Sequence, residues 1–435
     1  MRRAVAKLLA IVLYIVPLAA SSQAWLPDRD KREGAGIRLG ERLIFHPGTA
    51  IEGGYDTNPL RVDEDPNGAA RMRLSGYLDL ATRDPERRIE DSTVESPTPP
   101  KVDFRFGLAG YYDFFFDRDP VGSADEQDDF GIDSHLNLTL FPNRPVTATA
   151  NVIYARTLQP YESPAERHAR HTIDPNLSLR VTPGGGTLSF KLSYGAMFLV
   201  YEELSVASIN NKVTQNIELE TSWKVFPRTA LMSKVQYSPV YYLGTRGENR
   251  ISNPVRGQLG IRGLLTNRFG ISLFAGYGAS FYSEGDDFDG LIASGELMFF
   301  PTPFSNIRIG GGRDFVDSFY ANFYTKSGGY IRYDHMFGGV FLLSFKTDVY
   351  YHSYSYLSYY PPGSYYAMEQ DFTNRADLWV SSTLLLEYRI TEWLSAMISG
   401  EYESVISDFY YVNTWANDPV KYHKFEVMGG VRVHY

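Results

Sequence analysis

The chain has 435 residues and a formal net charge of -9, with 21% charged and 15% aromatic residues. This apolar and aromatic content excludes a disordered chain. The 38 Gly and 32 Tyr residues disfavour a coiled coil or a helical repeat. The chain has no cysteine, which excludes disulfides, thiolate metal ligands and cysteine nucleophiles. Beyond the N-terminus, no apolar run is long enough for a helical membrane span.

The N-terminus has the pattern of a secretory signal peptide. Three bases precede an apolar stretch at 8–20, and the small residues of Ser22-Gln23-Ala24 form a cleavage site. A buried N-terminal helix is the alternative. We expect a signal peptide at 1–24, a short periplasmic N-terminal segment at 25–45 and an outer-membrane β-barrel at 46–435. Cleavage removes three bases and no acids, so the mature chain is more acidic still, which disfavours nucleic acid as a partner.

From about residue 50 to the end, apolar and polar residues alternate with period two. The alternation is clear at 102–114, 188–198, 213–225 and 340–352. These runs exceed the usual five or six residues of a soluble strand and suit the roughly 9–11 residues that cross a bilayer. The pattern predicts an all-β fold, a transmembrane antiparallel β-barrel of about 18 strands, with centres from near residue 52 to near residue 428.

The connections between these strands alternate in length. Short turns are predicted at 141–144, 182–185, 226–227, 266–267, 300–303, 338–339 and 391–392, and longer polar loops alternate with them. Short periplasmic turns, long outer loops and periplasmic termini are typical of outer-membrane barrels. The polar, Pro-rich segment 83–100 departs from this pattern, and we interpret it as a disordered periplasmic loop. We therefore expect the protein in the bacterial outer membrane, in contact with its lipid.

Alternation also predicts which charged residues face the barrel lumen. They carry mixed signs with a slight basic excess. A hydrated wall held by cross-strand pairs is the simpler reading. A conduit that prefers anions or acidic sugars is the functional one. The predicted lumen-facing residues are Arg71, Arg73, Arg105, Arg180, Lys191, Glu218, Glu220, Arg262, Glu296, Arg308, Lys346, Asp348 and Arg432.

Two aromatic features stand out near the end of the chain. Tyrosine-rich residues 350–366 form a candidate sugar-stacking loop, because Tyr rings offer flat apolar faces with a polar tip. An interfacial aromatic girdle and loop packing are the alternative. The candidate stacking residues are Tyr354, Tyr356, Tyr359, Tyr360, Tyr365 and Tyr366.

The last strand ends on an aromatic residue in register with its apolar face. Phe425, Val431, Val433 and Tyr435 share that face. This pattern looks like the terminal β-signal through which the barrel-assembly machinery recognises outer-membrane barrels, and that machinery is an expected partner. The alternative is an ordinary edge strand that happens to end at Tyr.

We find no constellation for catalysis or cofactor binding. Glu166, His168 and His171 lie together in a predicted loop, where solvated side chains are the simpler reading than a metal site. Neither His-Ser nor His-Asp pairing stands out, and the triple-glycine stretches precede no helix that could bind phosphate. We therefore predict a protein that is not an enzyme and that has no cofactor and no metal.

Residues 38–58 carry a resemblance to a known group of proteins. The stretch contains His46-Pro47-Gly48, an alternating segment 51–55 and Asp56-Thr57-Asn58. It resembles the opening of outer-membrane β-barrels from myxobacteria and related bacteria. Some of these are porin-like proteins associated with exopolysaccharide export. Pro59 and the long 83–100 segment depart from that pattern.

The resemblance implies a conduit that exports polysaccharide across the outer membrane, with a separate periplasmic polysaccharide-export protein as partner. The alternatives are a structural or surface-adhesion barrel without transport and a general solute porin. The predicted barrel size favours transport, because barrels of 16–18 strands normally leave an aqueous channel unless something folds into it.

Overall fold

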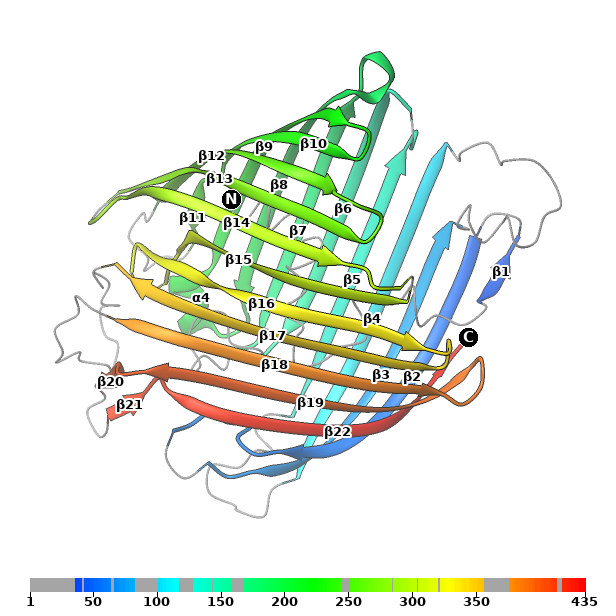
Figure 1. Ribbon diagram of the computed structural model, residues 1–435. Helices are drawn as coiled ribbons and strands as arrows, with labels where there is room; N and C mark the ends of the chain where they lie inside the picture. The colour runs from blue at the N-terminus through cyan, green and yellow to red at the C-terminus, as the bar shows by residue number, and fades with distance from the viewer. Residues whose placement is uncertain are drawn as a thin grey trace.

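The structure is a computed structural model, and it describes residues 36–40, 43–63, 66–82, 101–116, 128–142, 144–158, 168–243, 251–283, 285–302, 304–319, 321–355, 375–412 and 417–435. The predicted signal peptide and the segment 83–100 lie outside the described residues. The chain forms one closed, antiparallel β-barrel (Figure 1).

Eighteen strands make up the barrel wall, and β10 and β11 together form one of them, since both pair with β9 and β12. In chain order these are β2 (Leu43–Asp56), β3 (Ala69–Thr82), β4 (Val102–Phe116), β5 (Asp129–Leu140), β6 (Val146–Thr157), β7 (Arg170–Val181), β8 (Leu188–Tyr201), β9 (Lys212–Phe226), β10 (Thr229–Tyr237) with β11 (Val240–Tyr242), β12 (Ile251–Leu264), β13 (Phe269–Tyr282), β14 (Phe288–Phe299), β15 (Ser305–Asp317), β16 (Phe323–Phe337), β17 (Phe341–Tyr354), β18 (Ala376–Arg389), β19 (Leu394–Ser407) and β22 (Tyr422–His434).

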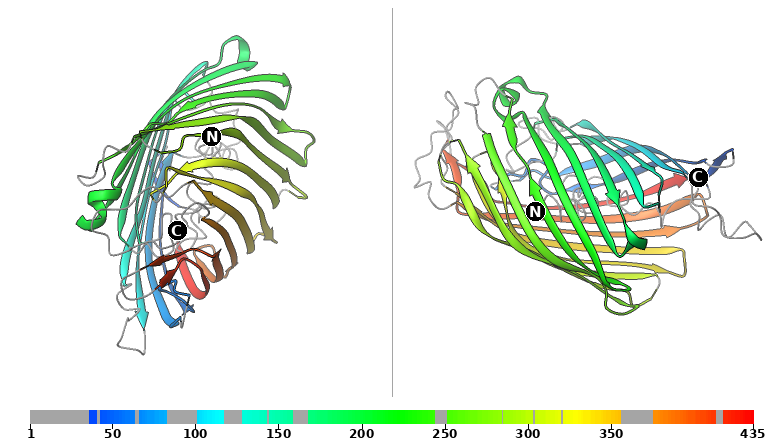
Figure 2. Two further views of the ribbon diagram at one scale, coloured as in Figure 1. Left: turned by 90° about the vertical axis from the view of Figure 1, so that its left-hand side faces the viewer. Right: turned by 90° about the horizontal axis from the view of Figure 1, so that it is seen from above.

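Every barrel strand pairs antiparallel with its neighbour in the chain, and the last strand β22 pairs with both β19 and the first strand β2. This last pairing closes the wall, as the three views of the ribbon show (Figures 1 and 2). Closure leaves no sheet edge, so the backbone N–H and C=O groups of the wall pair with one another rather than with solvent. The predicted number of strands is confirmed.

The two ends of the barrel differ. One end carries short turns, among them the 3₁₀ turn η3 (Gly184–Gly186), together with the C-terminus and the short strand β1 (Ile37–Leu39), which pairs with β2. The other end carries the long connections, including helix α4 (Leu204–Asn210) and the hairpin of β20 (Tyr410–Val412) and β21 (Asn417–Pro419). Figure 1 shows the two ends on opposite sides of the wall. By analogy with outer-membrane barrels, the short-turn end is periplasmic.

Side-chain burial alternates along the strands. In β22 the pattern alternates over nearly all of its 13 residues, with Val431 and Val433 exposed and Arg432 and His434 buried. In the strands around the barrel, the exposed residues of the outer face are mostly apolar, for example Leu259 and Leu291. A closed wall with an apolar outer surface is what lipid requires, since lipid offers no hydrogen bonds. The chain is an outer-membrane β-barrel. None of the described helices is long and apolar enough to cross a membrane, a finding that concerns helices alone.

Candidate functional site

The inner wall consists of the strand residues that alternate with the exposed apolar residues and therefore face the lumen. The structure buries part of the predicted lumen-facing set almost completely and leaves Arg180 exposed, with the rest between these limits. The strongly buried members are Arg71, Arg73, Glu218, Glu220, Glu296 and Arg432. The half-buried members are Arg105, Lys191, Arg262, Arg308, Lys346 and Asp348. Their part in a conduit stays a prediction.

A buried ionic network crosses the closure between the last strand and the first. Arg71 on β3 bonds to Glu426 on β22, passing over β2, and also to Asp113 on β4 at 2.6 Å. Lys424 on β22 lies 2.9 Å from Asp56 at the end of β2. Removing one partner of such a buried pair leaves an uncompensated charge and costs about 3–5 kcal/mol. Loss of any one partner would therefore destabilise the closed wall at its seam.

The Asp-Thr-Asn motif of the sequence is part of this closure. We call Asp56-Thr57-Asn58 the seam latch. The backbone N–H of Thr57 donates to the carbonyl of Phe425 at 3.0 Å, and the hydroxyl of Thr57 accepts from the backbone N–H of Phe425 at 2.8 Å. The amide of Asn58 donates to the carbonyls of His423 at 2.9 Å and Val62 at 2.7 Å. The motif joins β2 to β22 at the extracellular end, so its presence has a structural explanation.

Next to the seam latch, an arginine in the first extracellular loop bonds back into the wall. Nε of Arg61 lies 3.1 Å from Glu403 on β19, and the hydroxyl of Tyr422 donates to the same carboxylate at 3.3 Å. Burial alone would lower the pKa of the Arg61 guanidinium, but the charge of Glu403 and those of other neighbouring acidic groups together outweigh burial and raise that pKa above its ordinary value. Arg61 therefore stays charged and holds the loop against the wall.

On the opposite side of the barrel, the inner wall is packed with apolar rings. Arg256 on β12 reaches over β13 and β14 to Asp314 on β15 at 3.2 Å, and its guanidinium lies 3.8 Å from the centre of the Phe315 ring. Phe288 stacks on Phe315 with ring centres 4.2 Å apart. Ile292 belongs to the same buried cluster. Side chains that bridge non-adjacent strands fill the interior and narrow any passage along this wall.

The loop between β15 and β16 crosses the extracellular mouth. We call residues 318–322, of which 320 lies outside the described residues, the strap. Phe319 packs against Leu199 and Tyr201 of β8, although five wall strands separate β8 from β15. Nζ of Lys212 lies 4.2 Å from the centre of the Phe319 ring. The hydroxyl of Tyr242 donates to the carbonyl of Ser318 at 3.1 Å. The strap is therefore anchored on the far wall.

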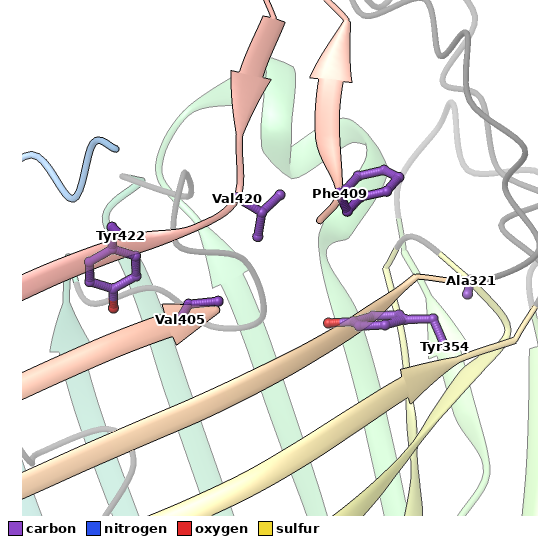
Figure 3. Packing of buried hydrophobic residues seen from close by; sticks show 6 residues of the cluster. All are labelled: Ala321, Tyr354, Val405, Phe409, Val420 and Tyr422. Carbon is purple, nitrogen blue, oxygen red and sulfur yellow. The ribbon is translucent and has the colours of Figure 1, made fainter. Parts of the chain in front are cut away.

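The other end of the strap meets a second apolar cluster. Ala321 joins Tyr354 of β17, Val405 of β19 and the residues Phe409 and Val420 of the last extracellular loop (Figure 3). Tyr422 completes this cluster. The strap thus links the loop cluster over β17–β22 to the far wall at β8, and it lies across the mouth of the barrel.

Of the candidate sugar-stacking tyrosines, Tyr354 is the one that the structure describes. Its side chain is only 5% exposed, and the Arg375 guanidinium lies 4.2 Å from the centre of its ring. Arg375 in turn pairs with Asp377 at 2.8 Å. The face of Tyr354 is covered by protein and takes part in packing. Tyr356, Tyr359, Tyr360, Tyr365 and Tyr366 lie outside the described residues, and their role in stacking stays a prediction.

The four residues of the proposed β-signal lie on the outer surface. Phe425, Val431, Val433 and Tyr435 are all exposed, and Val431 stands opposite Ile51 of the first strand. The backbone N–H of Tyr435 donates to the carbonyl of Pro47 at 3.1 Å. Recognition by the barrel-assembly machinery stays a prediction.

An ion cluster at the extracellular ends of β5–β8 was missed by sequence reasoning. Arg156 bonds to Asp129 at 2.7 Å and to Glu202 at 2.6 Å, and Nε2 of His171 lies 3.0 Å from Glu202. Hydrogen bonds from Arg156 lower the pKa of Glu202, and they outweigh the effect of partial burial. Residues at the ends of four strands meet here, and neither periodicity nor spacing signals such a meeting. Among the described residues, no group of three or more His, Asp or Glu could hold a metal ion.

Comparisons with known proteins give a distant structural similarity. The sequence matches no family model and no curated protein. OccK2 (OpdF) of Pseudomonas aeruginosa in complex with glucuronate aligns with a TM-score of 0.45 and 10% identity, covering 89% of this chain and 97% of that chain. The outer membrane protein opdK of P. aeruginosa aligns with a TM-score of 0.44 and 9% identity over 90% and 99%. The FrpB iron transporter of Neisseria meningitidis aligns with 0.43 and 8% over 91% and 82%. The chain is thus distantly similar to outer-membrane β-barrel channels.

Proposed function

We propose that the protein is an outer-membrane channel that acts as a conduit for exopolysaccharide. The observation that supports a channel is the closed 18-stranded wall with a polar, charged inner face. Barrels of this size are wide enough for an aqueous passage unless something folds into them. The resemblance of residues 38–58 to export-associated barrels supports polysaccharide as the cargo. Part of that resemblance, the seam latch, is explained by its role in closing the barrel. The identity of the cargo therefore needs an experiment of its own.

The strap and the apolar cluster around Phe315 affect how such a conduit would work. They narrow the barrel at its extracellular mouth, and a polymer could leave only after the strap had moved. Export systems supply such a polymer from the periplasm, and a periplasmic polysaccharide-export protein is the proposed partner at the short-turn end. The barrel-assembly machinery is the proposed partner for insertion.

A structural barrel without transport is the second candidate, and a specific observation favours it. Lys212, Asp377 and Arg170 on the inner wall are fully shielded from solvent. Charged side chains that water does not reach are typical of a barrel whose interior is filled by other side chains.

A deletion strain separates the two candidates. Loss of surface polysaccharide on deletion, restored by the wild-type gene, supports export. Normal surface polysaccharide in the deletion strain, together with a purified barrel that does not conduct ions even after the strap is cut back, would leave the structural role.

A further inference from the structure

The inner wall near the periplasmic end places like charges directly opposite one another. In the strand register, Arg308 of β15 stands opposite Arg332 of β16, and Arg332 stands opposite Lys346 of β17. On the other side of the barrel, Arg180 of β7 stands opposite Lys191 of β8. We call these five residues the basic track.

All five side chains belong to the inner wall. The neighbours of the track on β15, β16 and β17 are Ile309, Ile331 and Phe345, and each is exposed on the outer surface. The neighbours of Arg180 on β7 are Leu179 and Val181, which are exposed as well. Since side chains alternate between the two faces of a strand, the basic residues between them point inward. Each also lies near the short-turn end of its strand.

This arrangement works against stability. Like charges directly opposite on adjacent strands are destabilising, whereas opposite charges in that position stabilise the pair. The same wall shows the stabilising alternative, because Lys234 of β10 stands opposite Glu220 of β9 and their charged groups lie 3.2 Å apart. The basic track therefore needs an explanation other than the cohesion of the wall.

Nearby acids neutralise only part of the track. Asp334 pairs with Arg332 at 2.8 Å, and Asp348 pairs with Lys346 at 2.6 Å. Lys191 also stands opposite Glu220 of β9 in the register, but no ion pair of Lys191, Arg180 or Arg308 exists among the residues that the structure describes.

Glu296, the inward acid of β14 nearest to Arg308, accepts a hydrogen bond from Tyr330. Several donors thus remain for a ligand.

We propose that the basic track binds a polyanion, a polymer with carboxylate or sulfate groups along its length, as it enters the barrel from the periplasm. The proposal rests on the proposed channel and specifies its cargo. Adjacent strands lie about 4.8 Å apart, so the three bases on β15–β17 span about 10 Å and meet successive anionic groups rather than one. Arginine forms paired hydrogen bonds with such groups.

The test compares polymers and variants on the purified full-length barrel. Binding of fluorescent oligogalacturonate, dextran sulfate and neutral dextran is measured by anisotropy. We expect the two anionic probes to bind in a salt-dependent manner and dextran to bind weakly. The comparison of oligogalacturonate with dextran sulfate shows whether the track prefers carboxylate or sulfate groups. The triple variant Arg308→Gln, Arg332→Gln, Lys346→Gln should weaken anionic binding by about tenfold or more, because it removes three cationic donors at once.

Two further variants protect this test against misfolding. Arg180→Gln with Lys191→Gln removes two bases without stranding a paired carboxylate, and it should weaken binding in the same direction. Arg144→Gln with Arg268→Gln removes two exposed bases from short turns at the same end and should leave binding unchanged. Heat-modifiability on gels reports the folded barrel in each case.

The outcomes are distinct for the cargo and for the channel. Equal binding of dextran and oligogalacturonate, or equal losses in the track and turn variants, would overturn the polyanion proposal and leave the channel intact. Anion binding by a barrel whose deletion does not alter surface polysaccharide would retain the track and overturn the export proposal.

Discussion

Tyr242 and Asp317 meet across the extracellular mouth of the barrel, with the phenol hydroxyl donating to the carboxylate at 3.1 Å. Tyr242 ends β11 and Asp317 ends β15, so three wall strands separate the strands that carry them. The hydroxyl of Ser252 donates to the same carboxylate at 2.6 Å. Asp317 directly precedes the strap, and these bonds fix the point from which the strap crosses the lumen.

The first prediction concerns the ring that anchors the strap. Phe319→Ala removes the contact with Leu199 and Tyr201, and we expect a larger single-channel conductance in planar bilayers, because the strap loses its hold on the far wall. Phe→Ala at buried sites costs about 3–5 kcal/mol, and a loop position should lie at the low end. Phe304→Ala, at an exposed ring in a short turn, is the matched control. Identical conductance in both variants would contradict a constriction by the strap.

The second prediction concerns the seam latch. Asn58→Ala deletes the amide that bonds to the carbonyls of His423 and Val62, and each hydrogen bond lost costs about 0.5–1.5 kcal/mol. We expect the temperature at which the folded barrel converts to its slower gel form to fall. Asn267→Ala changes an exposed turn residue that accepts a hydrogen bond from Arg228, and it should leave that temperature almost unchanged. An equal shift in both variants would show that the latch adds nothing to closure.

The wall of the barrel could be predicted because its signal is local. Period-two alternation depends on each residue and its neighbours, and lipid imposes it on every strand. The predicted number of strands and the short turns at 266–267 and 338–339 are confirmed, and the turn predicted at 226–227 lies between Phe226 and Thr229. The first wall strand begins at Leu43, because Leu43, Phe45 and Pro47 continue the pairing with β3.

The site was less predictable because its contacts are not local. Phe319 meets Tyr201 across the lumen, and nothing in the period of either strand signals this. The inward face of Tyr354 also escaped prediction, since tyrosine suits both a girdle and a buried cluster. The basic track was recognised from the strand register, and the register depends on the pairing of whole strands. Sequence alone lists the charges without telling which stand opposite one another.

The third prediction concerns pH at the extracellular ion cluster. The pKa of Glu202 is lowered in the folded protein, so its contribution to stability is present above the unfolded pKa and is lost as pH falls through the folded pKa. We expect proteolysis near α4 to increase as pH falls below about 4.5, the ordinary carboxyl range. Glu202→Gln should be cleaved faster at neutral pH and should lose this dependence. The exposed turn variant Glu392→Gln should behave as wild type. A pH profile of Glu202→Gln that matched wild type would assign the effect elsewhere.

The last prediction concerns the terminal residue. Tyr435 is 55% exposed on the outer surface, and its backbone N–H donates to the carbonyl of Pro47 on the first strand. Changing it to Asp places a charge at the lipid-facing end of the closing strand, where a charged side chain costs about 1 kcal/mol or less near the interface. We expect less barrel in the outer membrane and more unfolded chain in the periplasm, measured by fractionation and heat-modifiability. Tyr388→Asp introduces the same charge at an exposed tyrosine of β18 near the same end. A loss limited to Tyr435→Asp identifies recognition of the terminal strand, whereas equal losses in the two variants would mean that lipid exposure alone explains the effect.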